Sequence, residues 1–395
     1  MDRGTRILIS GGGIAGLSLA YWLVKYGFQP VVVEKSPKPR EQGYAITLGG
    51  AGLEILRKMG RYDDLQGRNI QPGDNCYLDR GGRPVFRLDY GKLTRDLKEN
   101  GEEIITVTRG DIQDLLAMSA AEVGVNVRQG RSIRAIEQNE KDVHVTFDDG
   151  GEERFDLVFG ADGIHSQVRR LVFGEEQQFT RFLNAYVGAF KMPNTFGFEY
   201  GTTTHIEPRR MSSLYVYGEK DIIMMFIFTA ERPERIAPKD RKARLIEEYR
   251  KTGWKHFDVL EQAPSSEDIY LDAAIQVVMP KWHRGRVALV GDAAHCLTLL
   301  AGQGASLAMS GTYVLAKYIS ESDDHSVAFE SYESKLRPDS NRLQESSRKM
   351  SRFVVPTTEF GYQFRNLILR VVPTKFLINS VKRAHDLIDL DKMLK

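Results

Sequence analysis

The sequence predicts an α/β fold, because three stretches of the chain repeat one pattern. In each stretch a short apolar run typical of a buried strand leads to a glycine or an acid, at residues 7–16, 156–163 and 286–292. In the first stretch a helical pattern follows the glycines and a second strand-like run follows the helix, which is the order of a βαβ unit. Further strands are predicted over residues 182–230.

The first unit contains a glycine-rich turn between its strand and its helix. The turn reads Gly11-x-Gly13-x-x-Gly16. Gly11 permits the sharp turn, Gly13 lets a pyrophosphate approach the backbone, and Gly16 lets the helix pack closely on the strands. The helix begins within the turn, at Ile14 and Ala15, so its first backbone N–H groups would face the phosphates.

An acid ends the second strand of this unit. Glu34 follows the apolar run Val31-Val32-Val33 and lies about 18 residues beyond the last glycine. A carboxylate at that place can accept hydrogen bonds from both ribose hydroxyls of a nucleotide. Strand, turn, helix, strand and terminal acid together predict a dinucleotide-binding unit, without saying which dinucleotide it binds.

The other two stretches also deliver an acid at the end of a strand. The run Leu157-Val158-Phe159-Gly160 leads to Asp162, and the run Val287 to Val290 leads to Asp292. After Asp292 a loop of about ten residues precedes Gly302-Gln303-Gly304, which opens a helix. That spacing is too long for one pyrophosphate turn and suits a loop wrapped around an extended ligand.

Composition excludes several classes of protein. The 395 residues carry 55 Lys and Arg against 53 Asp and Glu, so there is no overall basic field to hold a nucleic acid. The two cysteines, Cys76 and Cys296, form no CxxC pair, which argues against a zinc site and for a reducing compartment. The sequence contains no window of about 18 apolar residues, so no transmembrane segment is predicted. We expect a cytoplasmic protein without bound metal, present as a monomer or weak oligomer.

These motifs resemble one protein family. The turn at Gly11–Gly16, the pair Asp162-Gly163 and the pair Gly291-Asp292, in that order, are similar to the signatures of the group A flavin-dependent aromatic hydroxylases, of the para-hydroxybenzoate hydroxylase type. The resemblance covers residues 5 to about 320. The stretches Tyr21-Trp22-Leu23 and Glu34-Lys35-Ser36 look closest to the tetracycline-inactivating monooxygenases and related antibiotic-tailoring hydroxylases.

The resemblance implies that the dinucleotide is FAD. It assigns the adenosine to Glu34, the ribityl chain to Asp292, and the flavin or its phosphates to Arg109, which begins a predicted helix. Asp162 is a dual candidate, for FAD and for a transient NADPH or NADH, and Arg40 is a weaker one for the same ligands. The predicted cofactor-binding residues are Gly11, Gly13, Ile14, Ala15, Gly16, Glu34, Lys35, Arg40, Arg109, Asp162, Asp292, Gly302, Gln303, Gly304 and Ala305.

The resemblance also implies an activity. NADPH or NADH would reduce the flavin, and a C4a-hydroperoxyflavin formed with O₂ would pass one oxygen atom to an aromatic or polyketide-like molecule, as in antibiotic modification or tailoring. The cofactor carries this chemistry, so the sequence singles out no catalytic side chain. Three alternatives share the motifs: an FAD-dependent reductase or dehydrogenase, Baeyer–Villiger insertion, and a flavin-binding sensor or sequestering protein without turnover.

The same resemblance predicts two interleaved domains. A Rossmann-like FAD-binding domain would comprise residues 1–70, 100–175 and 281–325, and an antiparallel-sheet substrate domain residues 71–99 and 176–280. Residues 326–395 would form a C-terminal helical segment divided by Pro338, Pro356 and Pro373. The apolar side chains proposed to line the substrate cavity are Phe190, Met192, Tyr215, Tyr217, Met225 and Phe226.

One departure from the family pattern follows the third motif. Relatives usually carry Pro-Pro shortly after the Gly-Asp pair, and this chain has Thr298-Leu299 instead. Because proline restricts the backbone, its absence predicts a more flexible loop beside the flavin.

Overall fold

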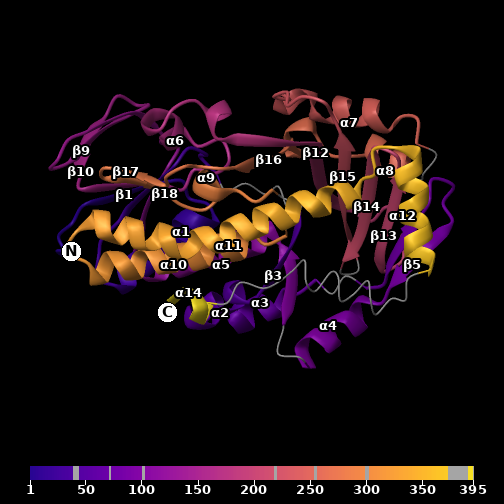
Figure 1. Cartoon of the computed structure of the whole chain (residues 1–395), viewed down its shortest axis with the longest axis horizontal. Coiled ribbons are helices and arrows are strands. Elements are labelled where there is room, and N and C mark those ends of the chain that lie inside the picture. Colours follow the sequence, from indigo (N-terminus) through magenta and orange to yellow (C-terminus); the bar gives the residue numbers. More distant parts are fainter. Residues whose placement is uncertain are drawn as a thin grey trace.

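The computed structural model describes residues 1–38, 44–70, 73–99, 103–217, 220–252, 256–298, 302–371 and 390–394. Parallel and antiparallel sheets are combined with helices, and the two largest sheets lie toward opposite ends of the long axis (Figure 1). The α/β fold predicted from the strand and glycine pattern is confirmed.

The first large sheet has six strands and carries all three predicted motifs. In spatial order its strands are β17 (His283–Arg284), β18 (Val287–Leu289), β11 (Leu157–Gly160), β1 (Ile7–Ser10), β2 (Val31–Glu34) and β7 (Asn126–Gln129). All but β17 run parallel, and Ser10 is in register with both Val33 and Gly160. The carboxyl ends of β1, β2, β11 and β18 therefore meet at one edge, where ligands of open α/β sheets bind.

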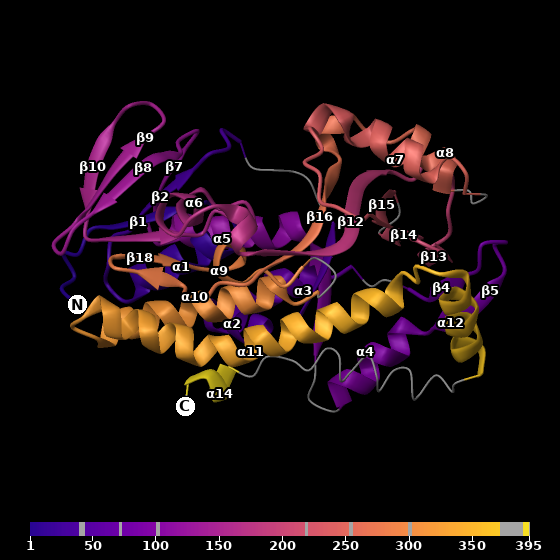
Figure 2. The ribbon, with the colours of Figure 1, turned by 45° about the horizontal axis from the view of Figure 1, so that its top comes forward.

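Helices cover this sheet. Those near the motifs are α1 (Ile14–Lys25), α5 (Arg109–Glu122), α6 (Gln167–Val172), α9 (Asp292–His295) and α10 (Gly304–Glu321). Helices α1 and α10 pack together, and the Thr312 hydroxyl of α10 lies 2.8 Å from the Ser18 hydroxyl of α1. A three-stranded sheet, β8 (Ile133–Gln138), β9 (Val143–Phe147) and β10 (Glu152–Phe155), lies on the side away from α10 (Figure 2).

The second large sheet has seven strands. In spatial order they are β16 (Tyr270–Val277), β12 (Thr180–Pro193), β15 (Asp221–Thr229), β14 (Arg210–Tyr217), β13 (Gly201–Glu207), β4 (Asn75–Leu78) and β5 (Pro84–Leu88). Only the β13 to β4 pair is parallel. Helices α7 (Arg241–Tyr249) and α8 (His256–Glu261) form an apolar core with one face of this sheet.

A long helix connects the two large sheets. Helix α11 (His325–Val354) packs beside α10 through Tyr332 and Leu336 and ends next to the open face of the seven-stranded sheet (Figures 1 and 2). We expected Pro338 to divide this segment, and that is wrong, because Pro338 lies inside the continuous helix. Buried contacts on both sides of it outweigh the backbone hydrogen bond that proline removes.

The remaining elements complete the region between the sheets. They are the two-stranded sheet of β3 (Ala45–Gly49) and β6 (Ile104–Thr108), and the helices α2 (Ala51–Lys58), α3 (Tyr62–Gly67), α4 (Tyr90–Glu99), α12 (Glu359–Val371) and α14 (Leu390–Leu394). In the described part of the chain, every helix is too short or too polar to cross a membrane.

Candidate cofactor and substrate site

The three glycines of the first motif occupy different surroundings. Gly11 has φ of 111°, and a Cβ atom there would lie 2.4 Å from the Ala161 carbonyl oxygen. A Cβ atom on Gly16 would lie 1.9 Å from the Gly11 carbonyl oxygen, whereas one on Gly13 would meet nothing within 4 Å. The fold thus requires glycine at positions 11 and 16, while Gly13 leaves open space above the start of α1.

That open space faces uncapped backbone donors. Helix α1 begins at Ile14, and its N-cap residue, Gly13, supplies no side-chain hydrogen bond to the first turn. The first N–H groups of a helix, together with the helix dipole, favour an anion at this end. The predicted pyrophosphate site therefore has both the space and the donors that it needs.

Glu34 is oriented by the backbone around it. Its Oε2 accepts a hydrogen bond from the Gly12 N–H at 2.8 Å, and its Oε1 accepts one from the Ser36 N–H at 2.8 Å. Each carboxylate oxygen keeps capacity for a further donor, so ribose hydroxyls can still bind. Lys35 is exposed at the end of the same strand. Arg40 lies outside the described residues.

The third motif packs directly against the first. A Cβ atom on Gly291, which has φ of 58°, would lie 2.8 Å from the Ala15 Cβ of α1. Asp292, the next residue, begins α9, and a Cβ atom on Gly304 would lie 3.9 Å from its Oδ1. The start of α1, the Asp292 carboxylate and the start of α10 thus lie together, as the sequence predicted for an extended ligand.

Asp292 is surrounded by protein on several sides, but its side chain remains accessible to solvent, as expected for a group that lines a cleft. Burial among protein atoms raises its pKa, and the positive charge of Arg109 acts in the opposite direction. Arg109 begins α5 as predicted, after a capping box between Thr108 and Asp111. Arg109 therefore faces the same cleft as Asp292.

Two tyrosines that sequence reasoning missed border this cleft. The rings of Tyr44 and Tyr270 have centroids 5.3 Å apart, and the Tyr44 carbonyl oxygen accepts the Arg109 N–H at 2.9 Å. Burial raises the pKa of Tyr44 to about 12, although the charge of Arg109 lowers it in part. Both phenols thus stay protonated near neutral pH. No pattern marks them, because they come from segments more than 200 residues apart in the sequence.

In the second motif, the Asp162 side chain makes hydrogen bonds within its own loop. The Asp162 carboxylate accepts hydrogen bonds from the Ser166 hydroxyl and from the Val168 N–H, the latter at 3.0 Å. Arg169, which is fully buried, then donates to the Ala293 carbonyl oxygen at 3.0 Å. This arginine, another residue that sequence reasoning did not single out, links the second motif to the third.

His295 follows the third motif and serves as a structural residue. It is buried, and its ring lies 4.7 Å from the Trp282 ring, centroid to centroid. Burial lowers the pKa of His295 to about 3, so the imidazole is neutral and poorly suited to accept a proton during a reaction.

Buried polar atoms without partners test whether the cleft fits FAD. Gln303, the N-cap residue of α10, is 4% exposed, and its Nε2 has no hydrogen-bond partner in the part of the chain that the structure describes. The same holds for the hydroxyl of Thr298, which is 5% exposed. Gly304 and Ala305 open α10 directly after Gln303, and Gly302 precedes it. The unpaired donors of Gln303 and Thr298 suit the polar edge of the isoalloxazine ring. Gly13 and Glu34, at the other end of the cleft, suit the pyrophosphate and the adenosine ribose.

The six apolar residues predicted for the substrate cavity lie on both faces of the seven-stranded sheet. Phe190, Met192 and Phe226 belong to the buried core that includes α7 and α8. Strand alternation places Tyr215, Tyr217 and Met225 on the opposite face, where all three are only partly buried. Hydrophobicity could not separate the two groups, because both faces of this sheet carry apolar side chains.

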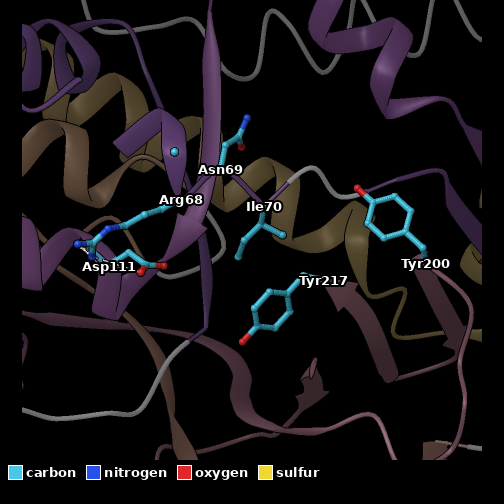
Figure 3. A pocket seen from close by; sticks show the side chains of 7 residues that line it. Arg68, Asn69, Ile70, Asp111, Tyr200 and Tyr217 are labelled. Carbon is cyan, nitrogen blue, oxygen red and sulfur yellow. Dashed lines mark hydrogen bonds and ion pairs between the residues drawn. The ribbon is translucent and has the colours of Figure 1, made fainter. Parts of the chain in front are cut away.

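A pocket lies where that open face meets the elements around α5. Its volume is about 510 Å³, within the range of small-molecule sites, and Figure 3 shows Tyr217 below Ile70 and Tyr200 to the right of it. Arg68 Nη1 lies 3.5 Å from Asp111 Oδ1 at one end of the pocket. The lining residues are Gly67, Arg68, Asn69, Ile70, Asp111, Tyr200 and Tyr217.

Comparisons with known proteins agree with this geometry. A family model described as FAD binding domain matches residues 4–346. A flavin-dependent monooxygenase from an unknown prokaryotic organism is 35% identical over 342 residues, which cover 86% of this chain and 87% of the relative. The crystal structure of tetracycline destructase Tet(55) is 30% identical, with a TM-score of 0.82 and 99% of each chain covered. The Klebsiella pneumoniae HpxO complex with FAD and uric acid shares the fold, with 21% identity, a TM-score of 0.79, and 100% of this chain and 98% of that chain covered.

The family match thus spans all the elements that carry the three motifs, and a named flavin-dependent relative covers most of the chain. The resemblance drawn from the motifs is confirmed, and FAD is the cofactor of this family. The chain belongs to the FAD-binding-domain family of flavin-dependent monooxygenases.

Proposed function

We propose that this enzyme uses NADPH or NADH to insert one oxygen atom from O₂ into an aromatic or polyketide-like small molecule. The observation that carries the proposal is the 510 Å³ pocket between the open face of the seven-stranded sheet and the start of α5. Asp111 of that pocket lies on the same helical turn as Arg109, whose charge reaches Asp292 in the cofactor cleft. Substrate and flavin sites would therefore adjoin.

The cofactor would lie along the cleft from Glu34 to α10. Glu34 would bind the adenosine ribose, the open turn at Gly13 the pyrophosphate, and Asp292 the ribityl hydroxyls. Arg109 would compensate negative charge in the same cleft, and the N-terminal end of α10, at Gly304, would favour an anionic ring edge. When bound, reduced FAD supplies the activation of O₂, while these side chains hold and orient it.

The substrate would contact the open face of the sheet. Tyr215, Tyr217 and Met225 lie on that face and would line the substrate site, whereas Phe190, Met192 and Phe226 pack against α7 and α8 and would not reach it. Tyrosine rings suit a flat, conjugated molecule, and the Arg68 to Asp111 pair offers polar groups for phenolic or carbonyl oxygens. A tetracycline-like compound is a reasonable first substrate to test, since one similar structure is a tetracycline destructase.

We assign the two large sheets to the two interleaved domains. Support comes from their strands, because all six of the first sheet fall within residues 1–70, 100–175 and 281–325, and all seven of the second within 71–99 and 176–280. The nicotinamide donor would bind transiently near the second motif, since the sequence contains no second glycine-rich turn of the type Gly-x-Gly-x-x-Gly in a strand and helix context.

Turnover with isotopically labelled oxygen tests the proposal. Purified protein should contain FAD, and its NADPH or NADH oxidation should accelerate when tetracyclines or other polycyclic phenols are added from a compound library. Mass spectrometry should then find one atom from ¹⁸O₂ in a product. FAD-bound protein that reduces or dehydrogenates a compound without incorporating labelled oxygen would favour the reductase alternative. Bound flavin with no turnover of any compound would favour a sensor.

A further inference from the structure

Thr298 adopts a backbone conformation that its residue type rarely takes. Its φ is 97°, in the left-handed region that favours glycine, although threonine is branched at Cβ. Among the described residues, the other non-glycine residues with positive φ are Asn184 and Arg209, neither of which is β-branched. Proline, which relatives usually carry after the Gly-Asp pair, is locked near a φ of −65° and cannot adopt this conformation.

A buried polar clamp holds the backbone just before Thr298. The Cys296 carbonyl oxygen accepts hydrogen bonds from the Val277 N–H and from Gln344 Nε2, both at 3.1 Å. The Leu297 carbonyl oxygen accepts one from Gln276 Nε2 at 3.1 Å and one from the Ser347 hydroxyl at 3.2 Å. Gln276, Gln344 and Ser347 are all buried. The expected flexible loop is therefore firmly held up to residue 297.

Clamping explains how the unfavourable φ persists. A strained conformation survives only where the surrounding structure determines the backbone independently, and strained residues gather at ligand sites. Here four hydrogen bonds fix the carbonyl groups of Cys296 and Leu297. Two of the donors belong to β16 and two belong to α11. The position of Thr298 is thus imposed by elements outside its own loop.

The Thr298 side chain also carries an unmet hydrogen bond. It is 5% exposed, and its Oγ1 has no partner in the described part of the chain. A buried hydroxyl without a partner is unfavourable, so one in the segment between Asp292 and the start of α10 calls for a ligand group. Gln303 Nε2 is in the same state at the start of α10, on the far side of the same loop.

We propose that the Thr298 hydroxyl donates a hydrogen bond to the isoalloxazine ring of bound FAD and so positions the ring. The ring offers several acceptor oxygens and nitrogens, whereas a proline in this position offers no donor. The proposal rests on the cofactor site described above and adds a ring contact that proline-bearing relatives lack. The Thr298 hydroxyl would then gain its hydrogen-bond partner only when the flavin is bound.

Titration of the apoprotein with two ligands tests this contact. FAD contains the isoalloxazine ring and ADP does not. Calorimetric titration with each ligand therefore distinguishes the affinity that the ring contributes from the affinity that the nucleotide contributes. Thr298→Val keeps the shape and the branching but removes the hydroxyl, and we expect its FAD dissociation constant to rise about fivefold to tenfold. Its ADP affinity should stay within about twofold of wild type. Thr298→Ser, which keeps the hydroxyl, should bind FAD like wild type.

The visible absorption spectrum of bound flavin gives a second readout. Thr298→Val should shift the flavin bands relative to wild type, because the ring loses a polar contact, and Thr298→Ser should not. Equal FAD affinity and an unchanged spectrum in Thr298→Val would overturn the proposal, as would an equal loss of ADP affinity. Wild-type protein that binds ADP but not FAD would instead refute the cofactor site itself.

Thr298→Gly separates the strain from the hydrogen bond. Glycine adopts a φ of 97° freely, so the melting temperature of the apoprotein should rise. FAD affinity should fall as it does in Thr298→Val, because the hydroxyl is absent in both. A Thr298→Gly variant that binds FAD as tightly as wild type contradicts the role of the hydroxyl.

Discussion

Replacing Arg169 by methionine should destabilise the protein more than most single substitutions. Its guanidinium is fully buried and donates from Nη1 to the Ala293 carbonyl oxygen at 3.0 Å and from Nη2 to the Ile164 carbonyl oxygen at 2.6 Å. Glu176 lies 3.5 Å away from Nη2. Methionine fills much of the same volume but leaves these three acceptors without their donor.

The magnitude follows from those contacts. A hydrogen bond to a charged group contributes about 1.5–3 kcal/mol, so the two carbonyl contacts together contribute about 3–6 kcal/mol. The pair with Glu176, whose side chain is 31% exposed, adds little. Methionine avoids the desolvation of a buried guanidinium, which offsets part of the loss. We therefore expect the free energy of unfolding of the apoprotein to fall by about 3 kcal/mol.

Urea unfolding of the apoprotein, followed by tryptophan fluorescence and by circular dichroism, measures this change where the two transitions coincide. The matched control is Arg170→Met, the adjacent arginine, which is exposed and bonds only to Gln167 in the described structure. Its unfolding free energy should stay within about 0.5 kcal/mol of wild type. If Arg169→Met is no less stable than Arg170→Met, the two carbonyl contacts do not hold the second and third motifs together.

Three further predictions follow from the glycine turn, an ion pair and the sheet. Gly13→Ala should keep the wild-type melting temperature without ligand but bind FAD far more weakly, whereas Gly16→Ala should unfold or express poorly, because its Cβ would overlap a carbonyl oxygen. The pKa of His165 is raised to about 9 by hydrogen bonds to Asp272 and Glu176, so its stabilisation is full below about pH 6.5 and lost as pH rises through 9. The difference in melting temperature between wild type and His165→Asn should therefore shrink over that interval. Phe226→Ala should lower the unfolding free energy by about 3–5 kcal/mol, whereas Tyr217→Phe should leave it nearly unchanged and raise KM for the substrate.

Each of these has a result that would contradict it. Equal FAD affinities for wild type and Gly13→Ala would mean that the pyrophosphate does not approach the open turn. A difference in melting temperature between wild type and His165→Asn that stays constant from about pH 6 to about pH 10 would show that the ion pairs of His165 with Asp272 and Glu176 do not stabilise the fold. A Phe226→Ala variant as stable as Tyr217→Phe would mean that the assignment of the two sheet faces is wrong.

The cofactor side of the site could be predicted from sequence because its parts are short and local. Within the strand, turn and helix of residues 7–25, the positive φ of Gly11 and the Gly11 carbonyl oxygen that crowds Gly16 both require glycine. The parallel register then brings Glu34 to the same edge. Asp292 also follows a strand directly. In each case a few neighbouring residues determine both the conformation and the chemistry.

The substrate side could not be predicted in the same way. Tyr217 and Phe226 are both aromatic and both lie in strands, and their faces differ only because α7 packs on one side of the sheet. The pocket combines Arg68, Asp111 and Tyr200 from distant segments, and no periodicity relates them. Likewise, the clamp on Leu297 depends on α11, which follows that loop in the chain. Tertiary packing decides these features.

The six-stranded sheet is completed late in synthesis. Strand β11 ends at residue 160, its neighbour β18 begins at residue 287, and the chain between them forms five strands of the other large sheet. A growing chain therefore exposes the apolar edge of β11 while β12 to β16 emerge from the ribosome, and unpaired apolar edges promote aggregation. FAD, which stabilises only a chain that can bind it, cannot assist before Asp292 has been made. Chaperone binding, rather than flavin supply, should thus limit the yield of folded protein.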